Sequence, residues 1–490
     1  MVFEMKQLPS TTNNKPQTSF MALSRIWSAF IIIAIVVAGF KYAVSGESKM
    51  VFNKMVVGKS GDTSNTKAID SAAIPTAIAA QLRTGKEAKN GEDKYIKVDT
   101  GKFIVCKEQS ANGILETCKD AVNICIGFIG VMALFMGFLS IAEKAGGIQF
   151  LARIITPFFS RIFPDVPKGH PAYGHMILNF SANLLNLDNA ATPFGIKAME
   201  SLQELNPHKD RASNAQLMFL CLHASGLTLI PVSIIAIRAS MKASNPTDIF
   251  IPCMIATFTA TIAALIIVSF KQKINLFQPV ILGWILGLSA VIASLVLYLK
   301  TLAADGVTNF SRIVSNGLIL SIFLLIVIGA LYKKINVFDA FIDGAKGGFE
   351  VAVKIIPYIV GMLVAISMLR TSGTFDYIID GVKSLFMAMG ADTRFVDGLP
   401  TALIKPLSGS GARGVMIDTM RNFGPDSFAG KLSGVLQGSS DTTFYVIAVY
   451  FGAVSVKDTR YAAGAMLLAD LVGIITSIFL AYLFFGNSTG

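Results

Sequence analysis

Charged residues are scarce in this sequence: Asp, Glu, Lys and Arg make up only 15% of its 490 residues. Soluble globular domains carry roughly a quarter of their residues as charges, so the shortage excludes an ordinary soluble domain. Apolar residues account for 53% of the chain and gather in long runs. A bilayer core roughly 30 Å thick requires about 20 apolar residues per helix. The sequence therefore predicts an all-α polytopic membrane protein with nine or more spanning helices.

The apolar residues fall into uninterrupted runs and two interrupted ones. The interrupted runs, 173–199 and 399–416, are broken by Gly, Pro, Asn and Ser. The uninterrupted runs are 26–44, 121–142, 216–237, 249–270, 276–299, 313–331, 353–369, 432–454 and 462–485. The first of these follows about 25 polar residues and is close to span length, which favours a retained anchor over a cleaved signal.

Cysteine and histidine are also rare, with five and four residues. The cysteines show no CxxC spacing, and the histidines form no metal spacing with them. Cys106 and Cys118 lie outside the predicted spans, and their spacing alone leaves open whether they pair. The chain has no HExxH, P-loop or GxSxG motif. We therefore expect no enzyme activity, no metal site and no cofactor; a coupling cation, Na⁺ or H⁺, is left open.

The net charge of +11 does not indicate nucleic-acid binding, because the basic residues stand beside spans and form no basic helix. Lys6, Lys15 and Arg25 precede the first span and favour a cytoplasmic N-terminus. The short loops agree with this orientation except at Arg238 and Lys242. We expect a multi-pass protein of the bacterial cytoplasmic (inner) membrane.

Residues 45–109 interrupt the apolar pattern and are polar, rich in Lys, Gly, Ser and Thr. Short strand-like pieces stand at 95–98 and 102–105. The predicted orientation places this insert outside the cytoplasm.

An internal repeat connects residues 116–131 with residues 344–359. Each segment leads into a span, and each is followed by an interfacial stretch, an interrupted run and two long spans. Five predicted spans separate the two starts, an odd number, so the copies would insert in opposite directions. Matching interrupted segments in two inverted halves are the best sequence indication of a transport site at the membrane midplane.

The first interrupted run carries amides and a carboxylate in an apolar stretch. Its candidate solute-binding residues are Asn183, Asn186, Asp188, Asn189 and Thr192. Buried amides and a carboxylate can coordinate a polar solute or a cation. The alternative is that they only cap a helix in a surface loop, but the apolar flanks argue against a surface position.

The second interrupted run contains Ser408 and Ser410 among glycines that spell GxGxxG. A dinucleotide site would need a preceding strand and a βαβ unit, and neither is predicted here. A Ser/Gly-rich turn whose amides face an anionic or hydroxylated ligand fits better.

Polar residues also gather inside the span at 432–454, where we single out Gln437, Ser440, Asp441 and Thr442. A charge inside a span costs about 2.5–3.5 kcal/mol on insertion scales, so Asp441 is a functional candidate. The alternative is that it pairs with Lys or Arg to hold helices together.

The corresponding place in the first half holds His223 and Ser225. A histidine there can carry a proton or can be a hydrogen-bonded core residue, and the sequence leaves both readings open. Asp470 and Glu143 are weaker candidates, because side chains near helix ends can reach the interface.

At these segments the chain resembles a known family. Asn189-Ala-Ala-Thr-Pro-Phe-Gly-Ile-Lys-Ala-Met and Phe163-Pro-Asp-Val-Pro are similar to spore maturation protein A. Leu407-Ser-Gly-Ser-Gly-Ala-Arg-Gly-Val-Met and Gln437-Gly-Ser-Ser-Asp-Thr-Thr-Phe-Tyr are similar to spore maturation protein B. The resemblance covers roughly residues 20–44 with 110–275, and 315–485, as in a fusion of the two; the insert departs from it.

The resemblance implies a nucleoside-recognition or gate domain, with two inverted repeats like the core of concentrative nucleoside transporters. It also implies transport of a nucleoside-like solute. Arg413 stands where relatives tend to carry an uncharged residue, which would favour an anion.

Five regions follow from the sequence: a tail and first span at 1–44, the insert at 45–109, an A-like gate domain at 110–275, connecting helices at 276–334 and a B-like gate domain at 335–490. We expect a permease for a small polar or anionic solute in the lipid bilayer, which could form a homo-oligomer. The alternative is a non-transporting envelope scaffold that binds a cell-wall or membrane partner.

Overall fold

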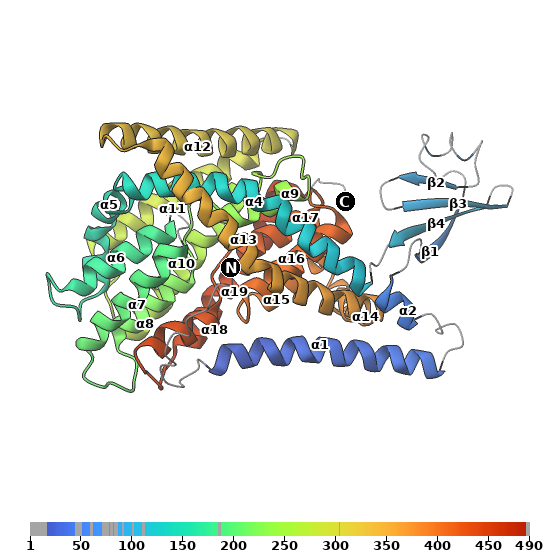
Figure 1. The fold of residues 1–490 in the computed structure, drawn as a ribbon, viewed down its shortest axis with the longest axis horizontal. Helices are drawn as coiled ribbons and strands as arrows, with labels where there is room; N and C mark the ends of the chain where they lie inside the picture. Colours follow the sequence, from blue (N-terminus) through green and yellow to red (C-terminus); the bar gives the residue numbers. More distant parts are fainter. Residues whose placement is uncertain are drawn as a thin grey trace, which may run out of the picture.

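The computed structural model describes residues 17–44, 51–58, 62–70, 78, 82, 87–90, 93–99, 102–109, 113–184, 188–302 and 304–486. The fold is nearly all helical, with a small sheet at one end (Figure 1). The first part contains α1 (Gln17–Val44), α2 (Val51–Val56), α4 (Ile114–Lys144), α5 (Gly147–Ile162), α6 (Pro171–Leu184), α7 (Asp188–Glu204), α8 (Asn214–Ala224), α9 (Val232–Ser240) and α10 (Phe250–Gln272). The second part contains α11 (Pro279–Thr301), α12 (Ala304–Tyr332), α13 (Val337–Thr371), α14 (Thr374–Ala388), η3 (Arg394–Asp397), α15 (Leu399–Ile404), α16 (Gly409–Phe423), α17 (Phe428–Gly438), α18 (Thr443–Val446), η4 (Ile447–Phe451) and α19 (Ala462–Phe485).

Within the described ranges, six helices are long and apolar enough to cross a membrane: α1, α4, α10, α11, α12 and α19. A seventh span results if α13 and α14, which meet at a bend of 75°, are counted together. The prediction of nine unbroken spans is therefore wrong for two runs. Residues 216–237 split into α8 and α9, and residues 432–454 split into α17, α18 and η4. In each of these runs a polar break interrupts the apolar residues.

The insert contains a four-stranded antiparallel sheet with the order β1-β4-β3-β2. Its strands are β1 (Asp62–Asp70), β2 (Glu87–Asn90), β3 (Asp93–Asp99) and β4 (Lys102–Gln109). The two strand-like pieces expected from the sequence lie in β3 and β4, which pair with Tyr95 opposite Val105. Tyr95 and Ala88 are buried against Ile78 and Leu82 in a small core of their own. Figure 1 shows the sheet beyond α2, at one end of the helical body.

The order of elements in residues 114–272 recurs in residues 337–485. In each half a long helix bends at a glycine with positive φ, Gly146 at 86° and Gly373 at 76°. A helical hairpin follows, then an 11-residue helix that begins after a serine N-cap, Ser213 before α8 and Ser427 before α17. A break and a final long helix complete each half. The inverted relation between the halves, and the likeness to concentrative transporters, stay predictions.

The two halves pack through α4 and α13, which lie along each other at the centre of the molecule (Figure 1). Close approach depends on small residues. A Cβ on Gly344 would stand 2.3 Å from the Met136 carbonyl oxygen, and one on Gly348 would stand 2.6 Å from the Ala133 nitrogen. Gly344 and Gly348 form a GxxxG pattern, which lets two helix backbones approach closely within a membrane.

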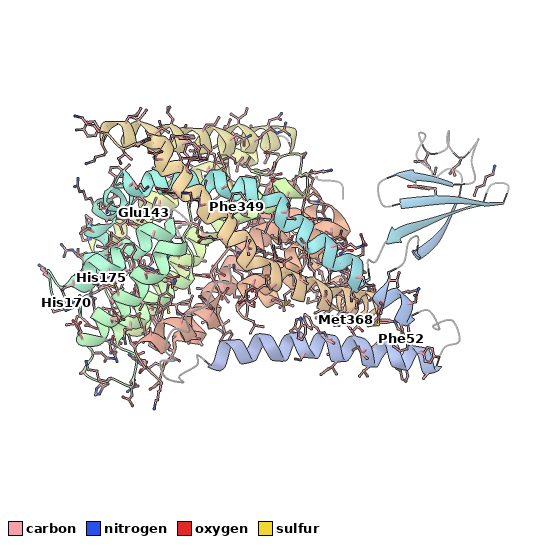
Figure 2. The ribbon with its side chains drawn as sticks, in the orientation of Figure 1. Phe52, Glu143, His170, His175, Phe349 and Met368 are labelled. Atoms are coloured by element: carbon pink, nitrogen blue, oxygen red, sulfur yellow. The ribbon has the colours of Figure 1, made fainter. Side chains whose placement is uncertain are left out.

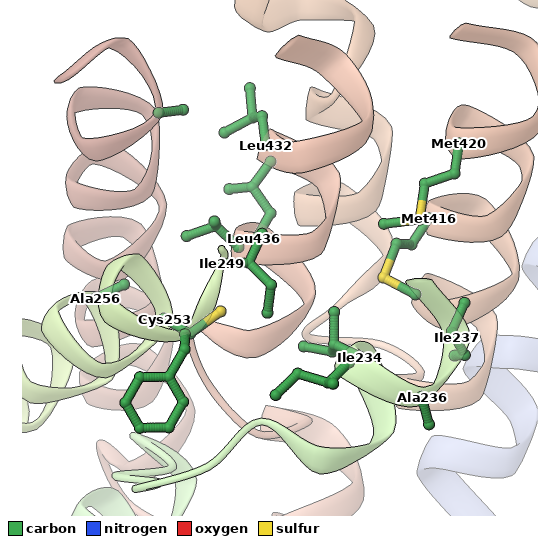
Figure 3. Packing of buried hydrophobic residues seen from close by; sticks show 14 of the residues in the cluster. Ile234, Ala236, Ile237, Ile249, Cys253, Ala256, Met416, Met420, Leu432 and Leu436 are labelled. Carbon is green, nitrogen blue, oxygen red and sulfur yellow. The ribbon is translucent and has the colours of Figure 1, made fainter. Parts of the chain in front are cut away.

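The buried core also crosses the boundary between the halves. Ile234 of α9 and Cys253 of α10 pack with Leu436 of α17 and Met416 of α16 in one apolar cluster (Figure 3). A Cβ on Gly438 would stand 2.8 Å from the Cys253 sulfur, so the end of α17 needs a glycine there. Residues of both halves therefore pack together in this cluster.

Candidate functional site

The breaks in the two short helices meet each other. The backbone N–H of Asp441, which follows α17, donates to the carbonyl of Ala224 at the end of α8, at 2.8 Å. Gly226 has a φ of +65°, and a Cβ there would stand 3.0 Å from the Asp441 nitrogen. Glycine is thus required for the close approach of the two interrupted backbones. Segments more than 200 residues apart in sequence meet at this point.

The side chains at this meeting point form a polar group that we call the His223 cluster: Asn179, Asn183, His223 and Asp441. The His223 Nδ1 lies 2.8 Å from the Asn183 amide nitrogen and 3.0 Å from the Asn179 Oδ1. Its Nε2 lies 3.8 Å from Asp441 Oδ2. The cluster therefore joins α6, α8 and the loop after α17, two elements of the first half and one of the second.

Burial differs sharply within the cluster. The His223 side chain is 4% exposed, whereas that of Asp441 is 46% exposed. The other carboxylate oxygen of Asp441, Oδ1, accepts the backbone N–H of Thr442 at 2.7 Å. One carboxylate oxygen of Asp441 is therefore held by its own loop, while nearly half of the side chain is exposed.

Tyr450 packs between the His223 cluster and α7. It belongs to η4, a π-helical turn, and such turns occur frequently at functional sites. Its ring centroid lies 4.8 Å from that of His223, and its hydroxyl is within hydrogen-bonding reach of Thr192 and Asn179. A Cβ on Gly195 would stand 2.5 Å from the Tyr450 ring, so this contact also depends on a glycine.

The second interrupted run forms a neighbouring group around Gly409, the first residue of α16. The side-chain N–H of Gln437 donates to the Gly409 carbonyl at 3.3 Å, while its Oε1 is buried with no hydrogen-bond partner among the described residues. A Cβ on Gly409 would stand 2.6 Å from the Thr442 hydroxyl oxygen. Ser408 caps α16 by accepting the Gly411 N–H at 2.9 Å and lies 3.3 Å from Ser410. Ser408 thus has a capping role in the structure.

The remaining candidate residues have other partners or lie outside the described residues. Ser225 bonds with Thr261 of α10 at 2.8 Å. Ser440 reaches the carboxylate of Asp470, and Arg413, in α16, is within electrostatic range of Cys125 on α4. Asn186 and the side chains of Asp188 and Asn189 lie outside the described residues. The expectation that Asn189 and Asp441 face one cavity stays a prediction.

Sequence reasoning missed or undervalued several buried polar residues. Asn179, Tyr450 and Lys405 were not singled out, although Asn179 is fully buried. Asp470 lies inside α19, is 3% exposed and accepts the Thr443 hydroxyl at 2.6 Å. The expectation that its side chain reaches the membrane interface is therefore wrong. Glu143 stands exposed at the end of α4 (Figure 2). The signal that could have found Asp470 is its place in the middle of an apolar run.

Two further findings concern sites outside these groups. Cys118, one member of the pair left open by the sequence, is a free thiol in α4. Among the residues with described side chains, no three His, Cys, Asp or Glu residues come together as a metal site would require. Polar groups at the two breaks can instead bind a solute through amide, hydroxyl, imidazole and carboxylate contacts.

Comparison with known proteins finds one matching family and two similar relatives. The nucleoside-recognition family, also called gate, matches residues 125–241 and 352–457. Spore maturation protein B of Bacillus subtilis is 46% identical over 177 residues, which cover 35% of this chain and 98% of the relative. Spore maturation protein A of the same organism is 40% identical over 154 residues, 31% of this chain and 79% of the relative. No solved structure is significantly similar.

The two matched gate segments contain the two broken helices, α8 with α9 and α17 with α18, and both breaks lie within them. The two relatives match different parts of the chain. The chain therefore belongs to the spore maturation protein A and B family of nucleoside-recognition membrane proteins, with an A-like and a B-like part fused in one polypeptide.

Proposed function

We propose that this protein is a permease for a small polar solute and that the solute binds at the His223 cluster. The observation that carries the proposal is the meeting of the two broken helices, Asp441 N–H to Ala224 carbonyl at 2.8 Å. Broken backbone at membrane depth is tolerated only where protein covers it or a cavity receives it. Two broken helices that meet at one place are more consistent with a binding site than with a purely structural role.

The chemistry of the cluster supports a solute with several hydrogen-bonding groups. Amides of Asn179 and Asn183 can both donate and accept, and the half-exposed carboxylate of Asp441 accepts. A ribose hydroxyl or a base edge presents such groups, which agrees with the description of the matching family as nucleoside recognition. A nucleoside-like solute is therefore the first class to test, and the protein would act in the cytoplasmic membrane with its N-terminus inside.

The test is uptake of labelled nucleosides, dicarboxylates and amino acids into proteoliposomes that contain the purified protein. Asp441→Asn keeps the shape of the side chain and removes its charge, so it is expected to lower uptake at least tenfold while the protein still inserts and folds. Asp343→Asn is the matched control, because Asp343 is 55% exposed and pairs with Lys144 at the surface; it should transport normally.

Two outcomes would contradict the proposal. If no solute enters and none raises the melting temperature of the purified protein, the permease function is wrong. If Asp441→Asn does not fold, the carboxylate holds the helices together instead. That result would favour the envelope scaffold, in which the folded sheet of residues 62–109 would bind a partner.

A further inference from the structure

The orientation of one asparagine determines where His223 carries a proton. The side-chain nitrogen of Asn179 donates to the Ala191 carbonyl at 2.6 Å. A carbonyl can only accept, so this contact fixes which end of the amide is nitrogen. The Asn179 oxygen must then be the atom that lies 3.0 Å from His223 Nδ1. An oxygen at that distance requires a hydrogen on Nδ1.

Asn183 can accommodate this proton. Its amide lies 2.8 Å from the same Nδ1, with the nitrogen placed nearest. The nitrogen and oxygen of an amide are assigned from the hydrogen-bond network and exchange by rotation of the group. Among the described residues its other side-chain hydrogen bond, to Asn179 Oδ1, is long at 3.5 Å. Turning the Asn183 amide therefore gives Nδ1–H two acceptors and loses little.

The other ring nitrogen then faces a carboxylate. Nε2 lies 3.8 Å from Asp441 Oδ2. With Nδ1 protonated, a neutral imidazole would present a lone pair from Nε2 to that oxygen, so two acceptors would face each other. One additional proton on Nε2 removes this conflict. It also makes the pair electrically neutral, whereas without it a single negative charge would stand inside the membrane.

Other charged and titratable groups surround the pair. Asp470 of α19 and Lys405, just after α15, are within electrostatic range of each other, and Asp470 also acts on Asp441. Lys405 is the positive group among these three residues, and Asp470 is a second negative one. Tyr450 packs against the His223 ring, and Cys221, two residues before His223 on α8, is a buried thiol. The side chain of Asp188 lies outside the described residues.

We propose that His223 and Asp441 form an imidazolium–carboxylate pair that holds one exchangeable proton and that this proton is the coupling ion of the permease. The coupling role rests on the proposed function; the protonation state does not. Asp441, the exposed member, exchanges the proton with water, and the Asn179 oxygen keeps Nδ1 protonated so that only Nε2 gains and loses it. A solute that donates a hydrogen bond to Asp441, or places a positive charge beside it, replaces the proton as the partner of the carboxylate.

The protonation state can be read directly, because the chain has only four histidines. Protein labelled with ¹⁵N-histidine would give four imidazole signals, and His223→Gln would assign the one of interest. The wild type at pH 7 is expected to show His223 with both nitrogens protonated. In Asp441→Asn the signal should change to the neutral form with hydrogen on Nδ1. His175→Gln is the control, since His175 bonds to Ser201 and its loss should leave the His223 signal unchanged.

A neutral His223 in the wild type, with hydrogen on either nitrogen alone, would overturn the proposal. Should Asp441→Asn not fold, Asn179→Leu tests the same arrangement: loss of the oxygen is expected to release Nδ1 and give a mixture of tautomers, and an unchanged signal would count against the proposal.

Uptake separates the two claims. Because the solute replaces the proton on Asp441, the two move in opposite directions. Solute uptake that an outward proton gradient drives in the wild type and not in His223→Gln supports the coupling role. Uptake together with a neutral His223 would support the permease function and contradict the imidazolium–carboxylate pair. An imidazolium signal without any uptake would support the pair and contradict both the coupling role and the permease function.

Discussion

Two ion-pair clusters occupy equivalent places in the two halves and differ in burial. At the start of α17, Arg238 of α9 bonds to Asp248 at 2.9 Å and Asp426 at 3.3 Å, while Lys431 also reaches Asp248 at 3.2 Å. We call these residues the Arg238 cluster, and its arginine side chain is 0% exposed. The corresponding cluster of the other half has fewer ion pairs and is more exposed.

At the start of α8, Arg211 pairs with Asp458 at 3.1 Å, and these side chains are 58% and 56% exposed. Arg460 bonds to the Asn214 side chain at 2.9 Å. We call these residues the Arg211 cluster. A cavity of about 430 Å³ lies beside it, lined in part by Arg211, Arg460 and the first residues of α8. Arg238 is therefore shielded from solvent at the start of α17, whereas Arg211 is exposed at the start of α8.

The same kind of contact between the halves can therefore differ in energy. In both clusters the loop before the last long helix of one half (α10 or α19) contacts the start of the broken helix in the other half. Exposed ion pairs contribute about 0–1 kcal/mol because water and salt screen them. Removing one partner of a buried pair costs about 3–5 kcal/mol, because a charge is left without compensation.

The largest effect is expected for Arg238→Met. The change leaves Asp248 and Asp426 without their main partner and removes the hydrogen bond to the Pro425 carbonyl. We expect a loss of about 3–5 kcal/mol, seen as a lower melting temperature of the detergent-solubilised protein. A loss no greater than that of the same substitution at Arg211 would show that burial does not separate the two clusters.

An intermediate and equal effect is expected at the two N-caps. Ser427 accepts the Gly430 N–H at 3.0 Å, and Ser213 accepts the Gln216 N–H at 3.2 Å. Replacing an N-cap serine by alanine typically costs about 1 kcal/mol, so Ser427→Ala and Ser213→Ala should lower the melting temperature alike. Ser213 also belongs to a capping box with Gln216. A clearly larger loss at Ser213 would mean that the box adds to the cap.

The smallest effect is expected for Arg211→Met. Its pair with Asp458 is more than half exposed, so the loss should be about 0–1 kcal/mol and should shrink as salt is raised. Melting temperatures at low and at high salt measure this directly. A large loss independent of salt would indicate that the cluster is buried in the membrane-embedded protein.

The long spans and the polar residues at the breaks could be predicted from the sequence, but the breaks in 216–237 and 432–454 could not. Averaged hydropathy treats His223 and Asp441 as minor defects in apolar runs. Their significance comes from a contact across more than 200 residues. The same holds for Arg238, which contradicted the positive-inside pattern. Its charge is buried between Asp248 and Asp426, so it is not a loop charge.

The insert shows a similar limit. Alternating residues near Tyr95 indicated strands, and β3 and β4 lie there. The polar segment Asp62–Asp70 gave no such signal, yet it pairs with β4. A strand at the edge of a sheet is determined by its partner more than by its own composition.

The fusion has a consequence for assembly. The Ala224–Asp441 contact, the His223–Asp441 pair and the Arg238 cluster all join the A-like part to the B-like part. Because α11 and α12 connect these parts in one polypeptide, each ribosome makes both in a one-to-one ratio. A short tether also sets an effective concentration on the order of millimolar. The polar site at the breaks is thus completed by intramolecular docking at any expression level. Dilution in the bilayer does not separate the A-like part from the B-like part.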